Sequence, residues 1–156
     1  MKTLSKLLLV GIVSLTTTSV IADAAKSEKH AQKATQLRQS VFSLLGSNMG
    51  PLGDMAKGKI DVDAWLVEKN ALRINQLSMM ISDYTQTDTS AFKVKTRAKN
   101  VVWTDRDKFL NNIEKLTTAS STLITAARSK DENAIKKAIA GVGKTCGGCH
   151  DDYRED

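Results

Sequence analysis

The chain has 156 residues, of which 41% are hydrophobic, so it is long enough for one compact domain and too short for two. Its formal net charge is +6, but the lysines are spread along the chain without interleaved aromatic residues, which argues against a nucleic-acid-binding protein. We expect a mildly basic, solvated surface with some attraction for anionic partners.

Residues 1–24 have the layout of a secretory signal peptide. Two lysines precede an apolar run over residues 7–15, which is too short to span a bilayer, and small residues follow it. A buried N-terminal helix is the alternative, but the three zones occur in the order that export requires. We therefore predict cleavage near Ala22 or Ala24, a mature domain over residues 25–156 and a periplasmic location without membrane association. Loss of two lysines and one aspartate would leave a formal charge of +5.

The mature part is predicted to be almost entirely helical, because apolar residues recur three and four positions apart and proline occurs once, at Pro51. The first helix should cover about residues 28–47 and end before Gly50 and Pro51. Its apolar face should consist of Ala34, Leu37, Val41, Leu44 and Leu45. A second helix should cover about residues 61–83.

Two further helices are predicted from capping-box patterns, one starting near Thr104 and one announced by residues 129–132. Four helices with one apolar face each predict an all-α protein, an antiparallel up-down-up-down four-helix bundle. The polar stretch at residues 84–102 is long for a bundle connection, which is typical of a functional or mobile loop. Aromatic residues make up only 4% of the chain, and a large planar cofactor would compensate for so few rings.

Both cysteines and one of the two histidines lie in Cys146-Gly147-Gly148-Cys149-His150. The apolar stripe of the last predicted helix continues into Cys146, Cys149, His150 and Tyr153, so the thiols and the imidazole should share its inward face. Two thiols at this spacing can each add to a vinyl group of a haem, and the following imidazole can ligate the iron. The motif therefore predicts one covalently bound haem c.

Three other interpretations of the two cysteines remain. A disulfide between Cys146 and Cys149 would close a very short loop in strained geometry. A redox-active dithiol is expected at the start of a helix that follows a strand, and no strand pattern precedes this motif. A zinc site needs four ligands, and outside the motif only His30 and carboxylates are available. We interpret His30 as a surface residue.

Four blocks of the mature chain resemble the cytochrome c′ family, four-helix-bundle cytochromes with a C-terminal haem motif. The blocks are residues 37–42, 48–52, 96–99 and 146–154, the last of which is the most specific because Tyr153 and Arg154 close it. The resemblance covers nearly the whole mature chain. It implies a periplasmic, often dimeric haem protein with a high-spin, five-coordinate iron, linked to electron transfer and to the binding of nitric oxide or carbon monoxide.

The resemblance also implies roles for individual residues. Cys146 and Cys149 would hold the haem by thioether bonds, and His150 would be the proximal iron ligand. Arg154 matches a basic residue beside that histidine, although it is equally explained as a solvated arginine in the last helical turn.

On the opposite side, Arg38 and Gln39 match a pair that meets the haem propionates, and a guanidinium suits a carboxylate. Phe42 matches an apolar residue over the open face of the iron, and Thr96 falls in the matched loop. Without the resemblance, Arg38 would be interpreted as part of a solvated helix face and Phe42 as an ordinary core residue.

Two functions remain open. We favour a haem protein with an open iron coordination site that carries electrons or binds gases, because the carbon side chain of Phe42 cannot ligate iron. The alternative is a six-coordinate electron carrier, which would need a methionine ligand, and Met49 is the candidate. Met49, Met79 and Met80 are otherwise interpreted as packing residues. No acid–base pair or distal histidine accompanies the motif, so we do not predict an enzyme. Small residues such as Ala31 and Ala34 on the first helix, together with the resemblance, predict a homodimer; the redox partner is not identified by the sequence.

Overall fold

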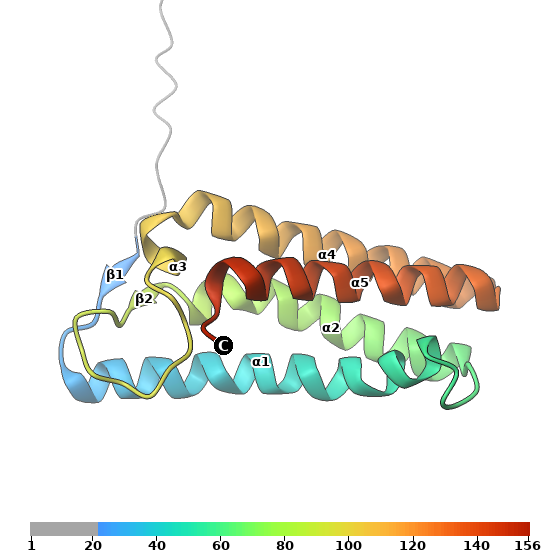
Figure 1. The fold of residues 1–156 in the computed structure, drawn as a ribbon, viewed down its shortest axis with the longest axis horizontal. Coiled ribbons are helices and arrows are strands. Elements are labelled where there is room, and N and C mark those ends of the chain that lie inside the picture. Colours follow the sequence, from blue (N-terminus) through green and yellow to red (C-terminus); the bar gives the residue numbers. More distant parts are fainter. Residues whose placement is uncertain (1–21) are drawn as a thin grey trace, which may run out of the picture.

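The computed structural model describes residues 22–156, so the predicted signal peptide lies almost wholly outside the described part. Four long helices run alternately up and down as an antiparallel bundle, which confirms the predicted fold class (Figure 1). The long helices are α1 (Glu28–Ala56), α2 (Ala64–Tyr84), α4 (Arg106–Ser129) and α5 (Glu132–Tyr153). Short elements are β1 (Asp23–Ala24), β2 (Thr87–Asp88) and α3 (Val101–Thr104). No helix within residues 22–156 is long and apolar enough to cross a membrane.

Small polar residues let α2 and α4 approach each other inside the bundle. Ser78 and Ser120 are completely buried, and the hydroxyls of Ser78 and Thr117 lie 2.7 Å apart. Asn75 donates from its side-chain amide to the Ser120 hydroxyl at 3.1 Å. These bonds satisfy polar groups that would otherwise be costly to bury, so the contact is fixed in register.

The sequence predicts that the first helix ends before Gly50 and Pro51. In the structure it continues to Ala56. Leu52 is 0% exposed and Met55 is 1% exposed, so the turn after the proline contributes to the core. The proline ring removes one backbone donor and bends the helix, and α1 changes direction close to its end in Figure 1. Burial of two large side chains outweighs the lost hydrogen bond.

The predicted apolar face of α1 is also partly wrong. Val41 is buried and Leu45 packs against the core, but Leu37 and Leu44 point to solvent with exposed fractions of 37% and 52%. The buried residues of α1 that precede Val41 are polar or small, and they include Arg38 and Ala31. Met79 and Met80 on α2 are exposed as well, so they are not packing residues of this bundle.

Neither predicted capping box is formed. Asp105 precedes α4 without a side-chain cap bond, so the capping box is absent, although α4 starts at Arg106, close to the predicted position. Ser129 ends α4, and the carboxylate of Asp131 accepts hydrogen bonds from the backbone N–H groups of Asn133 and Ala134 to cap α5. The tight connection from α4 to α5 passes through Lys130, which has φ 58°.

Residues 85–100 connect α2 to α3, and this segment contacts both ends of the described chain. Its strand β2 pairs in parallel with β1, and Ala98 forms an antiparallel bridge with Arg154. Figure 1 shows this segment crossing α1 and returning past the C-terminus. It covers the end of the bundle where α5 finishes.

Candidate functional site

A cavity of about 650 Å³ lies between the four long helices, near the end that residues 85–100 cover. This volume is within the range of roughly 300–1,000 Å³ found for ligand sites. Its deep wall is apolar and includes Ile74, Ile81, Ile113, Leu116 and Val142. All eight predicted site residues line it: Arg38, Gln39, Phe42, Thr96, Cys146, Cys149, His150 and Arg154.

The two thiols face this cavity from α5. Both cysteines are half-buried and they are not joined in a disulfide. Burial raises the pKa of the Cys146 thiol. Burial, with Cys146 and Asp152 nearby, raises the pKa of Cys149 to about 11. The thiols are therefore neutral at pH 7, unlike the low-pKa cysteines of dithiol redox enzymes.

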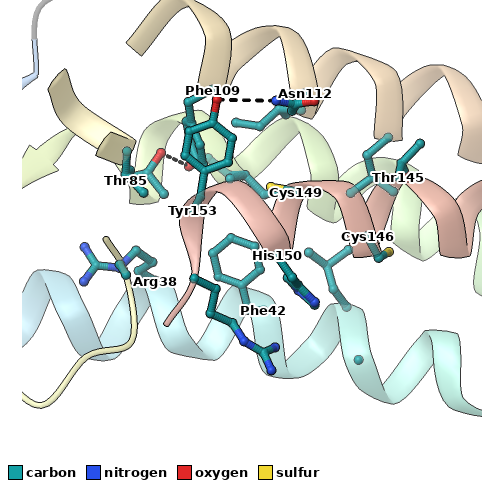
Figure 2. A pocket seen from close by; sticks show the side chains of 18 of the residues that line it. Arg38, Phe42, Thr85, Phe109, Asn112, Thr145, Cys146, Cys149, His150 and Tyr153 are labelled. Carbon is teal, nitrogen blue, oxygen red and sulfur yellow. Dashed lines mark hydrogen bonds between the residues drawn. The ribbon is translucent and has the colours of Figure 1, made fainter. Parts of the chain in front are cut away.

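His150 lies one residue further along α5, at the edge of the cavity. It is exposed, whereas Cys146 and Cys149 are half-buried, so the predicted inward face is only partly confirmed for the imidazole. Figure 2 shows its imidazole directed from α5 toward α1. Its pKa is lowered, first by burial and then by the positive charges of Arg154 and Arg97, while Asp151 acts in the opposite direction. A lowered pKa keeps the ring neutral, which is the form that binds a metal ion.

Arg38 is a buried cation that forms no salt bridge with a carboxylate of residues 22–156. It is 3% exposed, and its Nη2 atom donates to the hydroxyls of Thr35 and Thr96 at 3.3 and 3.1 Å. Its Nη1 atom has no hydrogen-bond partner in the described structure. Burial lowers the pKa of the guanidinium, and Asp88 only partly opposes this effect. Such a group is costly to bury unless an anion completes its hydrogen bonds, and a haem propionate has the required charge.

Gln39 and Thr96 hold residues 85–100 at the cavity mouth. The side-chain amide of Gln39 donates to the carbonyl of Lys95 at 2.9 Å. The Thr96 hydroxyl accepts from Arg38 and also from the backbone N–H of Ala98 at 3.1 Å. Thr96, the weakest match at the sequence level, is thus part of the Arg38 site.

Phe42 and Met49 lie on the same side of α1, seven residues apart, and both are half-buried in the cavity wall. The Phe42 ring rises from α1 into the space beside His150 (Figure 2). The Met49 methyl group is 3.8 Å from the position of a Cβ added at Gly143, so this thioether packs against α5.

Two aromatic residues support the site: Trp103, which has no predicted role, and Tyr153, whose predicted inward position is confirmed. The Trp103 ring centroid lies 5.2 Å from the Arg38 guanidinium, and its indole N–H donates to the Thr85 carbonyl at 3.0 Å. Tyr153 is 4% exposed and packs edge-on against Phe109 with ring centroids 5.0 Å apart. Trp103 could not be paired with Arg38 from spacing, because the contact joins α1 to α3.

The fold and the site together define a class: four-helix-bundle proteins in which a C-terminal CxxCH motif faces an apolar cavity. The sequence profile of the cytochrome c′ family matches residues 33–154, and the chain belongs to this family. It is 34% identical over 144 residues to cytochrome c′ from Cereibacter sphaeroides, covering 91% of this chain and 96% of the relative.

Solved structures of cytochrome c prime have a similar fold. Cytochrome c prime from Shewanella frigidimarina has a TM-score of 0.73 and 33% identity, covering 81% of this chain and 97% of the other. A nitric oxide complex of a variant of cytochrome c prime from Alcaligenes xylosoxidans has a TM-score of 0.72 and 25% identity, covering 81% of this chain and 96% of the other.

Proposed function

We propose that the protein is an exported, periplasmic c-type haem protein with a five-coordinate iron that carries electrons or binds nitric oxide and carbon monoxide. The observation that carries this proposal is the Cys146, Cys149 and His150 motif on the wall of an apolar cavity that also contains the buried Arg38 guanidinium, whose Nη1 atom has no partner in the described structure. The nitric oxide complex of an Alcaligenes xylosoxidans relative supports the gas-binding part.

The residues of the cavity fit a haem c. Cys146 and Cys149 would form the thioether bonds and His150 would ligate the iron. Arg38 would meet a propionate, while Gln39 and Thr96 hold the adjacent backbone in place. Arg154 would keep positive charge beside His150 and so disfavour protonation of the imidazole.

Phe42 would occupy the side of the iron opposite His150. Its ring has no atom that can ligate iron or donate a hydrogen bond to a bound gas. When bound, the haem supplies the iron centre that accepts one electron or one diatomic ligand, and the protein supplies an apolar pocket around it. Among the described residues that line the cavity, His150 is the one histidine and there is no carboxylate.

Met49 supports the second candidate, a six-coordinate electron carrier. Its thioether lines the same cavity, and methionine sulfur is a ligand that haem iron accepts. The two candidates differ in the spin state of the ferrous iron, which is high-spin for an open site and low-spin for a histidine–methionine pair.

One preparation of the mature protein tests haem attachment and coordination. Its intact mass should equal that of the polypeptide without the signal peptide plus one haem, and acid–acetone should not extract the haem. Absorption spectra of the ferric and ferrous protein should be those of a high-spin iron. Extraction of the haem would disprove covalent attachment, and a low-spin ferrous spectrum that Met49→Leu converts to high-spin would establish the alternative.

We further propose a homodimer that uses exposed apolar residues of two neighbouring helices. On α1 these residues are Leu37 and Leu44. On α2 they are Trp65, Leu72 and Met79, which are 68%, 40% and 48% exposed. Spacing of seven residues places each set along one line of its helix. Apolar lines of this kind are covered when two bundles pack helix against helix.

A further inference from the structure

Residues 93–99 form an extended segment in which every second residue is basic. Lys93, Lys95 and Arg97 are exposed and Lys99 is half-buried, whereas the intervening Val94, Thr96 and Ala98 are half-buried. This is the alternation of an extended chain with one face turned inward. No acidic residue occurs between Asp88 and Asp105. We call Lys93, Lys95, Arg97 and Lys99 the basic strip.

The basic strip is fixed in place by backbone hydrogen bonds. Its Lys95 carbonyl accepts from Gln39, and its Arg97 carbonyl accepts from the N–H of Glu155 at 2.7 Å. The N–H of Lys99 donates to the Tyr153 carbonyl at 3.0 Å. These bonds hold the strip at one position relative to α1 and the end of α5.

The basic strip also borders the mouth of the cavity. Thr96, Arg97 and Ala98 line the cavity from inside, and the segment passes over α1 beside the end of α5 (Figure 1). Any group that docks on the strip is therefore brought next to the cavity opening.

The charges of the strip are not neutralised evenly. In the described part of the chain, the salt bridges join Lys59 to Asp54, Arg128 to Glu68 and Lys136 to Glu132, all outside the strip. Lys99 Nζ donates to the Asp151 carbonyl and Arg97 Nε to the Glu155 carbonyl, which brings two acidic residues beside this half. Within residues 22–156, the side chains of Lys93 and Lys95 form no hydrogen bond or salt bridge, so we expect the positive field to be strongest there.

We propose that the basic strip is the docking site for an acidic electron-transfer protein, an inference that rests on the proposed electron-carrying function. Complementary charge would speed the encounter and orient the partner with its acidic surface on Lys93 and Lys95, next to the cavity mouth. A membrane surface is a poorer partner, because interfacial binding needs apolar side chains beside the cations and those of this segment turn inward.

The test uses the haem-loaded mature protein and an acidic plant-type [2Fe–2S] ferredoxin as the protein probe. Binding is measured by calorimetry at about 20 mM and about 200 mM salt, where screening differs strongly. The double variant Lys93→Gln/Lys95→Gln should weaken binding at low salt by about fivefold or more, and high salt should weaken the wild type in the same way. The matched control is Lys57→Gln/Lys137→Gln, which removes two exposed cations, one directly after α1 and one in the second turn of α5. The end of α1 and the start of α5 lie at the end of the bundle opposite residues 85–100 (Figure 1). It should change binding by less than about twofold.

Equal losses in the two double variants would show a net-charge effect and overturn the proposal, as would unchanged binding in Lys93→Gln/Lys95→Gln. Vesicles containing phosphatidylglycerol form a second arm. Vesicle binding that depends on Lys93 and Lys95, without ferredoxin binding, would assign the strip to a membrane surface instead.

Stopped-flow spectroscopy then follows one electron from the reduced cluster to the ferric haem iron, and the electron-transfer rate should fall with the loss of binding. Because the calorimetry reports docking alone, a protein that docks ferredoxin but does not accept its electron would contradict the proposed function and leave the docking site intact.

Discussion

The pocket residue Phe42 has the largest expected effect on ligand binding. The Phe42 ring lies in the space between α1 and α5 beside His150. In the proposed site, a diatomic ligand would have to displace this ring to reach the iron. We expect Phe42→Ala to remove this barrier and to speed carbon monoxide association with the ferrous protein by at least about tenfold, which corresponds to about 1.4 kcal/mol. Flash photolysis measures the rate.

The control for Phe42→Ala is Val41→Ala, which truncates the buried neighbour of Phe42 that lies outside the described lining of the cavity. Its association rate should remain close to that of the wild type. An unchanged rate in Phe42→Ala would show that Phe42 does not cover the iron.

Arg106 is a second buried cation, and it stabilises the end of a neighbouring helix. It is 7% exposed; its Nη1 donates to the hydroxyl of Thr85 at 2.9 Å and its Nη2 donates to the carbonyl of Ser82 at 2.9 Å. The last turn of α2 has no basic residue of its own, so Arg106 supplies the positive charge that the helix end favours.

Arg106→Lys should lower the free energy of unfolding by about 2–3 kcal/mol, because one compact ammonium cannot reproduce bonds from two guanidinium nitrogens. Urea titration measures the change. Arg128→Lys is the control: this arginine has 63% of its side chain exposed and pairs with Glu68 at 2.7 Å, so its loss should stay below about 1 kcal/mol. Equal losses would contradict a special role for Arg106.

The residues of the site differ in how far the sequence predicts them. Cys146, Cys149 and His150 are neighbours in the chain, so their shared face follows from helical spacing alone. The Arg38 environment does not, because Thr96 and Trp103 reach it from the loop and from α3. Long-range contacts of this kind depend on how the helices pack, which no local pattern contains.

At the scale of elements, α1 shows where a local rule fails. Proline predicts a helix end, yet the chain continues helically because the following turn is buried. We expect Leu52→Ala to lower the free energy of unfolding by about 2–5 kcal/mol, the usual cost of truncating a fully buried leucine. Ile60→Ala, in the loop after α1 and 46% exposed, should cost less than about 1 kcal/mol. A small loss in Leu52→Ala would mean that the turn after Pro51 is not part of the core.

The connection between α4 and α5 contains backbone strain. Lys130 has φ 58° and ψ 14°, a left-handed conformation that costs side chains with a Cβ roughly 1 kcal/mol. Lys130→Gly should therefore raise the free energy of unfolding by about 0.5–1 kcal/mol.

The opposite substitution is available at Gly58, which has φ 70° and where an added Cβ would meet no atom within 4 Å. Gly58→Ala should lower the free energy of unfolding by about 1 kcal/mol through the backbone alone. The two variants should shift the urea midpoint in opposite directions, and a shift in the same direction would contradict the strain argument.

At the scale of the whole molecule, residues 85–100 connect both ends of the described chain to the cavity. They pair with β1 through β2, bond to α1 through Lys95 and Thr96, and bridge to Arg154 beyond the haem motif. The sequence predicts a long functional or mobile loop here, but its order depends on contacts with distant segments. Cleavage after Ala22 would keep β1 in the mature protein, and cleavage after Ala24 would remove it.

The residues of α1 that are exposed on the bundle surface differ from those predicted, and this changes the expected contact between two molecules. Ala31 is buried and Ala34 half-buried, so Leu37 and Leu44 replace these small residues as the candidate contacts of α1. Two bundles that pack along α1 and α2 would cover these leucines, and a charge placed among them would be buried without a partner.

Sedimentation velocity at micromolar concentration should therefore show a dimer for the wild type and a monomer for Leu44→Glu. Thr122→Glu, which places the same charge on an exposed position of α4, should remain dimeric. Unchanged haem absorption in both variants would show that the fold is intact. A wild type that stays monomeric would show that this face is not a contact between two molecules. A Leu44→Glu variant that stays dimeric would show the same, because burying a glutamate without a partner costs more free energy than a contact of this size supplies.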